Sequence, residues 1–256
     1  MEIEFEGEYL KGKRNGKGKE FNIKGELIFE GEYLNGKKWN GNGYNIKGNK
    51  EFEIKDGKGN IKEYNYYNGI LKFEGEYLHG ERNGKGKEYY YNGKLEFEGE
   101  YLNGERNGKG KEYDKYTGKL KFEGEYLNGE KNGKVKEYYY NGKLKFEGEY
   151  LNGEIWNGQG YNIKGEIDFE IKDGNGKGKE YNHYGKLLFD GEYLNGERWK
   201  GKVKEYYWNG KLLFEGEYLK GERNGKGKEY NIDGTLRFEG EYLNGERQTL
   251  NKEYYN

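Results

Sequence analysis

The stretch FEGEYLNGERNGKGKEY, residues 97–113, contains the pattern that decides the fold. Its first six residues alternate, so Phe97, Gly99 and Tyr101 fall on one face of a strand and two glutamates on the other. An Asn/Gly-rich reversal follows, because Asn and Gly tolerate the positive φ of tight turns. The segment from Lys109 to Tyr113 then returns as a second strand. The stretch therefore predicts a β-hairpin.

The same phrase recurs along the whole chain. Intact neighbouring copies stand 24 or 25 residues apart. They begin at Phe5, Phe29, Phe73, Phe97, Phe122, Phe146, Phe214 and Phe238. A further copy at Phe189 has Asp190 in place of Glu, and two shorter copies begin at Phe52 and Phe169. Because each hairpin buries its face against its neighbours, the sequence predicts an all-β fold: an elongated, single-layer antiparallel β-sheet solenoid of about eleven stacked β-hairpins.

A longer period is present as well. The tripeptide Trp39-Asn40-Gly41 recurs 117 residues later, beginning at Trp156, and a degenerate repeat follows each copy. We therefore expect residues 1–256 to form one continuous array with a duplicated block of five repeats, 29–145 and 146–256.

The two degenerate repeats and the last repeat depart from the pattern. Ile54 and Ile171 replace the strand glycine in the degenerate repeats, so we expect a local bend or bulge at both places. The last repeat has residues 248–251 in place of Asn-Gly-Lys-Gly, which predicts a cap.

The composition argues against several classes of protein. Lys plus Arg (46) and Asp plus Glu (47) nearly cancel, whereas a nucleic-acid binder usually has a basic excess. We expect the Lys and Glu rows to share one face of the sheet and to pair across strands. The chain has no cysteine, its first ten residues lack the pattern of a secretory signal, and no apolar run approaches about 20 residues. We therefore expect a soluble, cytoplasmic protein.

Catalytic residues are not recognisable. The only histidines, His79 and His183, occupy variable positions and are expected on surface loops. Serine is absent, so nucleophilic triads have no support. The paired carboxylates recur beside Lys in every repeat, which indicates a structural role, and the Gly-Lys strings lack the spacing of a phosphate loop. We predict no enzyme activity, no cofactor, no metal site and no small-molecule substrate.

The pattern resembles the MORN repeat, whose units read aromatic-x-Gly-x-aromatic, then x-Asn-Gly, then a Gly-x-Gly second strand. Tyr101–Gly110 shows this pattern well. The resemblance implies a twisted β-sheet with an aromatic groove, used in assembly, membrane apposition or partner docking. The Tyr-Tyr-Asn-Gly-Lys-Leu segments at Tyr90 and Tyr139, and at Tyr207 with Trp208 as the second residue, are also similar to a bacterial MORN-variant family labelled as antitoxins.

The aromatic face is the candidate binding site, with packing alone as the simpler interpretation. The candidate residues are Tyr33, Phe73, Tyr77, Phe97, Tyr101, Phe122, Tyr126, Phe146, Tyr150, Tyr193, Phe214, Tyr218, Trp39, Trp156 and Trp199. The function we predict is a non-catalytic scaffold that docks a protein partner, or a second copy of itself, along an aromatic groove. The alternatives are a peripheral module that binds anionic lipid such as phosphoinositides, and an antitoxin-like protein that neutralises one partner.

Overall fold

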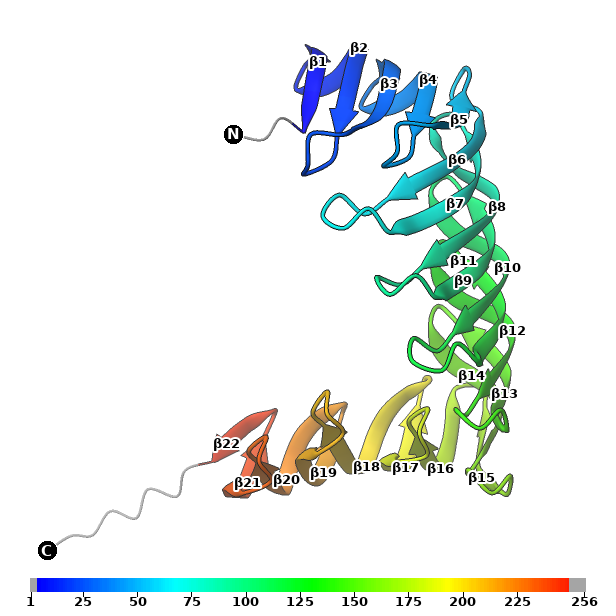
Figure 1. The fold of residues 1–256 in the computed structure, drawn as a ribbon. Helices are drawn as coiled ribbons and strands as arrows, with labels where there is room; N and C mark the ends of the chain where they lie inside the picture. The colour runs from blue at the N-terminus through cyan, green and yellow to red at the C-terminus, as the bar shows by residue number, and fades with distance from the viewer. Residues whose placement is uncertain (1–3, 249–256) are drawn as a thin grey trace, which may run out of the picture. The chain divides into compact units, whose positions relative to one another are not determined.

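The computed structural model describes residues 4–248, which contain β-strands and no helix (Figure 1). None of these residues could therefore cross a membrane as a helix. The predicted cap at residues 248–251 lies outside the described residues except for Gln248. The chain divides into two compact units, Met1–Glu130 and Lys131–Asn256. These two units are defined by compactness and not by sequence repetition. The duplicated blocks 29–145 and 146–256 therefore stay a proposal.

Each repeat forms a hairpin whose first strand carries Phe-x-Gly-x-Tyr. The strands of the N-terminal unit are β1 (Phe5–Leu10), β2 (Lys13–Phe21), β3 (Leu27–Leu34), β4 (Lys37–Tyr44), β5 (Lys50–Ile54), β6 (Gly59–Tyr64), β7 (Leu71–Leu78), β8 (Glu81–Tyr89), β9 (Leu95–Leu102), β10 (Glu105–Tyr113) and β11 (Leu120–Leu127). The C-terminal unit contains β12 (Glu130–Tyr138), β13 (Leu144–Leu151), β14 (Glu154–Tyr161), β15 (Ile167–Lys172), β16 (Asn175–Tyr181), β17 (Leu187–Leu194), β18 (Glu197–Tyr206), β19 (Leu212–Leu219), β20 (Glu222–Tyr230), β21 (Leu236–Leu243) and β22 (Glu246–Gln248).

Within each unit, consecutive strands pair antiparallel, as the alternating pattern predicts, except for β5 and β6. Gly110 of β10 lies opposite Gly99 of β9 on one side and Gly124 of β11 on the other. This register aligns the Lys rows with the Glu rows, so Lys111 is the partner of Glu98 and of Glu123. The predicted all-β, open antiparallel hairpin array is confirmed.

Two irregularities per repeat were not predicted. One residue separates Gly99 from Tyr101 in β9, but three separate their partners Arg106 and Gly110 in β10. A second shift lies between Glu112 and Tyr113, opposite the start of β11. Since bulges increase the local twist of a strand, each repeat adds twist at both ends of its second strand.

The degenerate repeats depart from this geometry in two ways. In the first one, β5 and β6 are joined only by a bridge between Lys55 and Lys58, so the sheet is interrupted there. In the second one, β15 and β16 pair from Phe169 to Lys172 without any register shift. The expected bulge is therefore absent from the pairing of β15 with β16, although β15 has a register shift against β14, between Gly160 and Tyr161.

The bend expected at these repeats is present in the connections on either side of them. Ile23, before the short strand β5, donates its backbone N–H to the carbonyl of Tyr66, after β6. Around β15, the N–H of Tyr140 donates to the carbonyl of His183, 3.1 Å away. In both units, the two hydrogen-bonded connections have a third connection between them in the sequence. The degenerate repeat therefore brings together connections that are not consecutive.

Candidate binding surfaces

The phenylalanine of each repeat from Phe29 to Phe214 is buried in the core. Phe97 packs edge-to-face on Tyr101 of its own repeat (centroids 5.7 Å apart) and on Tyr126 of the next (5.4 Å). A Cβ added to Gly110 would stand 2.5 Å from the Phe97 ring, so glycine at this position lets the ring lie close across the strand.

Charged side chains close the open side of this aromatic layer. The guanidinium of Arg106 lies 4.1 Å from the centroid of Phe97 and pairs with Glu88 and Glu112. Arg82 has the same arrangement over Phe73 and joins Glu63 to Glu88. Successive repeats are therefore linked by an Arg–Glu row, defined in the N-terminal unit by Glu63, Arg82, Glu88, Arg106 and Glu112.

The same pairing recurs in the C-terminal unit. Arg223 lies 4.0 Å from the centroid of Phe214 and pairs with Glu205 and Glu229. Lys131 and Lys145 both lie 2.9 Å from the carboxylate of Glu137. Half-buried charges in this arrangement hold neighbouring repeats together through charge-assisted hydrogen bonds.

The pKa values follow from these contacts. Burial works to raise the pKa of Glu63, but Arg82 and the hydroxyl of Tyr77 outweigh it, so the pKa lies below its ordinary value. Burial also opposes ionisation of Glu137, yet its two lysines hold that pKa below its usual range. Burial and the nearby Glu112 raise the pKa of Tyr126, whose hydroxyl donates to that carboxylate at 2.8 Å. These carboxylates are structural anions.

The predicted aromatic site separates into two groups in the structure. The first group is buried, with exposures from 0% to 5%: Phe73, Phe97, Phe122, Phe146, Phe214, Tyr33, Tyr101, Tyr126 and Tyr193. The second group is half-buried and reaches the surface: Tyr77, Tyr150, Tyr218, Trp39, Trp156 and Trp199. A buried ring cannot touch a partner, so only the second group can contribute contacts from this face.

Three of the four tryptophans share one structural position. Trp39, Trp156 and Trp199 are each the extra residue of a bulge, where the other repeats insert an Asn-Gly pair. The Trp156 carbonyl accepts the N–H of Gly174 at 2.8 Å, and its ring lies 2.7 Å from where a Cβ on Gly174 would stand. The tryptophans therefore fix one hairpin turn against the next.

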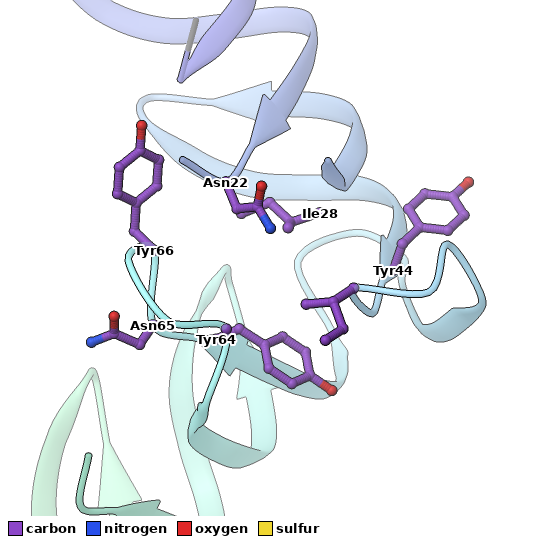
Figure 2. A pocket seen from close by; sticks show the side chains of 8 residues that line it. Asn22, Ile28, Tyr44, Tyr64, Asn65 and Tyr66 are labelled. Carbon is purple, nitrogen blue, oxygen red and sulfur yellow. The ribbon is translucent and has the colours of Figure 1, made fainter. Parts of the chain in front are cut away.

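Two small cavities lie beneath the connections. One, of about 10 Å³, is lined by Asn22, Ile28, Tyr44, Tyr64, Asn65 and Tyr66 in the N-terminal unit (Figure 2). The other, of about 30 Å³, is lined in the C-terminal unit by residues that include Glu137, Tyr139 and Glu180. Each has room for about one or two water molecules, so neither cavity fits an organic ligand. Among the described residues, no group of acidic and histidine side chains could hold a metal ion.

Sequence reasoning missed an exposed aromatic row. Most connections between hairpins place such a side chain at a single edge of each unit, which we call the loop edge. The exposed residues of the loop edge are Tyr67 (73%), Tyr91 (63%) and Tyr116 (68%) in the N-terminal unit, and Tyr140 (41%), Tyr184 (46%) and Trp208 (89%) in the C-terminal unit. The repeated Tyr-Tyr-Asn-Gly segments were the available signal.

The geometry of these connections explains why one aromatic side chain is held and the next is exposed. The hydroxyl of Tyr90 donates to the carbonyl of Tyr113, the last residue of β10, at 2.9 Å. Tyr91 then points outward, and the ammonium of Lys115 lies 4.0 Å from its ring centroid. The first aromatic residue of such a pair holds its connection against the end of the next hairpin, which leaves the second available for contact.

The two histidines differ in their surroundings. His79 occupies a hairpin turn with φ 53° and is exposed, as predicted. His183 was expected to be a simple surface residue, but its Nδ1 donates to the carbonyl of Tyr138 at 2.8 Å. It therefore ties together the two connections that meet at the bend around β15.

The comparisons with known proteins agree with the repeat pattern. Five segments match the family model of the MORN repeat: residues 5–22, 73–94, 97–115, 122–143 and 214–236. No curated protein matches the chain.

Solved structures add little. The chain is similar to one in "Crystal Structure of TcdB2-TccC3-TEV", at 9% identity over 84% of this chain and 13% of that chain, with a TM-score of 0.20. A second match is the Photorhabdus luminescens Tc holotoxin pore, at 9% identity over 79% of this chain and 14% of that chain, with a TM-score of 0.18. The chain thus spans a small part of their length, and these likenesses carry no argument. The chain is therefore an open all-β array of hairpins, five segments of which match the MORN repeat.

Proposed function

We propose that this protein is a non-catalytic scaffold that binds a protein partner through the loop edge. MORN repeats generally mediate binding to proteins or membranes. The observation that carries the proposal is the row of exposed aromatic side chains in successive connections, led by Tyr67, Tyr91 and Tyr116. Exposed Tyr and Trp are enriched at protein interfaces, because one ring supplies both apolar area and a hydrogen-bonding group.

A partner could also contact part of the aromatic face. Its half-buried members Tyr77, Tyr150, Tyr218, Trp39, Trp156 and Trp199 form the part of the predicted groove that a partner could reach. The buried phenylalanines would act indirectly, by keeping the connections in register. An antitoxin-like protein that neutralises one partner is a special case of this proposal, and a stable 1:1 complex with one protein would identify it. We also propose a cytoplasmic location, which cell fractionation would test.

The test compares partner capture by matched variants of the full chain. The loop-edge variant combines Tyr67→Ala, Tyr91→Ala and Tyr116→Ala, and the control is Tyr9→Ala, an equally exposed tyrosine on β1. Loss of a defined protein partner in the loop-edge variant alone supports the proposal. A partner set that is the same for wild type and both variants overturns it, provided that circular dichroism shows all three chains folded.

An anionic membrane surface, including one that displays phosphoinositides, is the second candidate. Exposed lysines accompany the aromatic row, with Lys94 and Lys119 in the N-terminal unit and Lys143 and Lys211 in the C-terminal unit. Aromatic rings favour the membrane interface, and each lysine near an anionic bilayer contributes about 1 kcal/mol. Flotation with vesicles that contain anionic lipid, compared with purely zwitterionic vesicles, distinguishes this candidate from a protein partner.

A further inference from the structure

The loop edge has a basic character that the net charge of the chain conceals. In the C-terminal unit, exposed Lys143, Lys164, Lys186 and Lys211 lie in four successive connections, with Glu166 and Asp233 as exceptions. The ammonium of Lys143 donates to the carbonyl of Lys164 at 3.2 Å, which ties two connections together. An ammonium has three donors, so one carbonyl leaves donors for an outside carboxylate.

The opposite edge of the same hairpins has the reverse character. We call it the tip edge, because it consists of the turns between the two strands of each hairpin. Exposed Glu197, Glu222 and Glu246 lie at successive tips of the C-terminal unit, with Lys220 and Arg247 as exceptions. Each tip also exposes a leucine, as Leu194 (37%), Leu219 (36%) and Leu243 (53%) do. The tip edge is therefore acidic and partly apolar.

The N-terminal unit repeats this separation over its last two hairpins. The loop edge there carries exposed Lys94 and Lys119, together with the tyrosines of the connections. Glu105 and Glu130 are exposed at the tips, with Leu102 (48%) and Leu127 (49%) beside them. The two edges are thus opposite in charge and both expose apolar side chains.

The two edges also share one spacing. Every hairpin contributes one tip and one connection, so both rows advance by two strands, about 10 Å, per repeat. A row of Glu and Leu can therefore be matched, repeat for repeat, by a row of Lys and aromatic residues from another copy. Electrostatic complementarity of this kind selects partners and fixes register.

We propose that the occupant of the loop edge is the tip edge of a second copy of this chain. This inference rests on the proposed function and names its partner. Lysines of one copy pair with tip glutamates of the next, while Tyr140, Tyr184 and Trp208 pack against the exposed leucines. Because the two surfaces differ, the contact is heterologous, and it leaves one free loop edge and one free tip edge for further copies.

The experiment uses charge reversal on the full chain. The loop variant carries Lys143→Glu, Lys186→Glu and Lys211→Glu, and the tip variant carries Glu197→Lys, Glu222→Lys and Glu246→Lys. All six residues are exposed, and circular dichroism verifies that both variants fold. Sedimentation velocity measures association at about 0.01 M and about 1 M salt, where the screening lengths are about 30 Å and 3 Å.

We expect wild type to associate at low salt and to dissociate at high salt. Each variant alone has two edges of like charge, so its association should be weaker than that of wild type by about tenfold or more. Mixing the two variants restores complementary edges and should restore association, as should combining all six substitutions in one chain. If the loop edge instead bound an anionic surface such as a vesicle, mixing the two variants would not restore association.

Three results would overturn the inference: wild type that stays monomeric at low salt, variants that associate as wild type does, or a mixture that gains nothing. These results are distinguishable from failure of the proposed function. If wild type stays monomeric but the triple tyrosine variant still loses a captured protein, the loop edge binds a different partner and only the self-association is rejected.

Discussion

At the scale of single residues, glycine decides how closely the rings approach the sheet. In most repeats the strand glycine allows the Phe ring to reach the Tyr of the next repeat, as Phe214 reaches Tyr242 at 5.2 Å. In the ninth repeat Val203 takes that place and is itself buried, and Tyr218 of the following repeat is only half-buried. The valine side chain at this position therefore replaces the contact between the Phe ring and the Tyr ring of the next repeat.

The first prediction concerns this glycine. Gly110→Ala should lower the free energy of unfolding by about 1–3 kcal/mol, because the new Cβ forces the Phe97 ring to move. Lys109→Ala, at the exposed neighbouring position, should change it by less than about 0.5 kcal/mol. Urea unfolding of both variants checks the difference, and equal stabilities would show that the ring adapts without cost.

The second prediction concerns acid stability. The pKa of Glu137 is lower folded than unfolded, so its contribution is present above the ordinary carboxyl pKa of about 4.3 and is lost as pH falls below it. Glu137→Gln should therefore be less stable at pH 7 and lose less stability on acidification than wild type. Glu147→Gln, on the exposed face, is the control. Identical pH profiles of unfolding for wild type and Glu137→Gln would contradict this role.

At the scale of the elements, the bulges carry the contacts between hairpins. The extra residue at Trp156 lets its carbonyl accept the N–H of Gly174, while Asn157 accepts the N–H of Asp173 at 2.9 Å. The same two bonds occur at Trp39 and Asn40, which supports the proposal that the block was duplicated. An alternating strand without a bulge could not direct these groups to the next turn.

The third prediction tests the bulge tryptophan. Trp156→Ala should destabilise the protein by about 2–4 kcal/mol, because the ring that packs on Gly174 is removed. Trp208→Ala makes the same chemical change at a site that is 89% exposed, and should cost less than about 0.5 kcal/mol. Denaturant unfolding followed by circular dichroism measures both; a costly Trp208 and a neutral Trp156 would reverse the assignment.

At the scale of the whole molecule, each described hairpin mainly contacts its neighbours, so stability should vary along the array. The strand β1 pairs on one side only, whereas β9 pairs with β8 and β10. The fourth prediction is that amides of Phe5–Leu10 exchange with solvent faster than those of Leu95–Leu102, because end strands open locally. Hydrogen exchange followed by mass spectrometry checks this, and uniform protection would indicate one cooperative unit instead.

Much of the fold follows from local chemistry that can be recognised in the sequence. Alternation places Phe97, Gly99 and Tyr101 on one face whatever the rest of the chain does, and Asn103-Gly104 supplies the positive φ of the turn. The repeated phrase then predicts stacked hairpins in register. These features depend on residues a few positions apart, so the sequence by itself determined them.

The tertiary structure alone decided which aromatic side chains are covered. Phe97 is buried by Tyr126 and Arg106, and whether they reach it depends on a bulge that the alternating pattern does not predict. Net charge sums over the chain and cannot show where charge lies. Only stacking in phase gathers lysines such as Lys211 at one edge and glutamates such as Glu222 at the other. Burial and edge charge arise from contacts between repeats, so they emerge only when the hairpins are assembled.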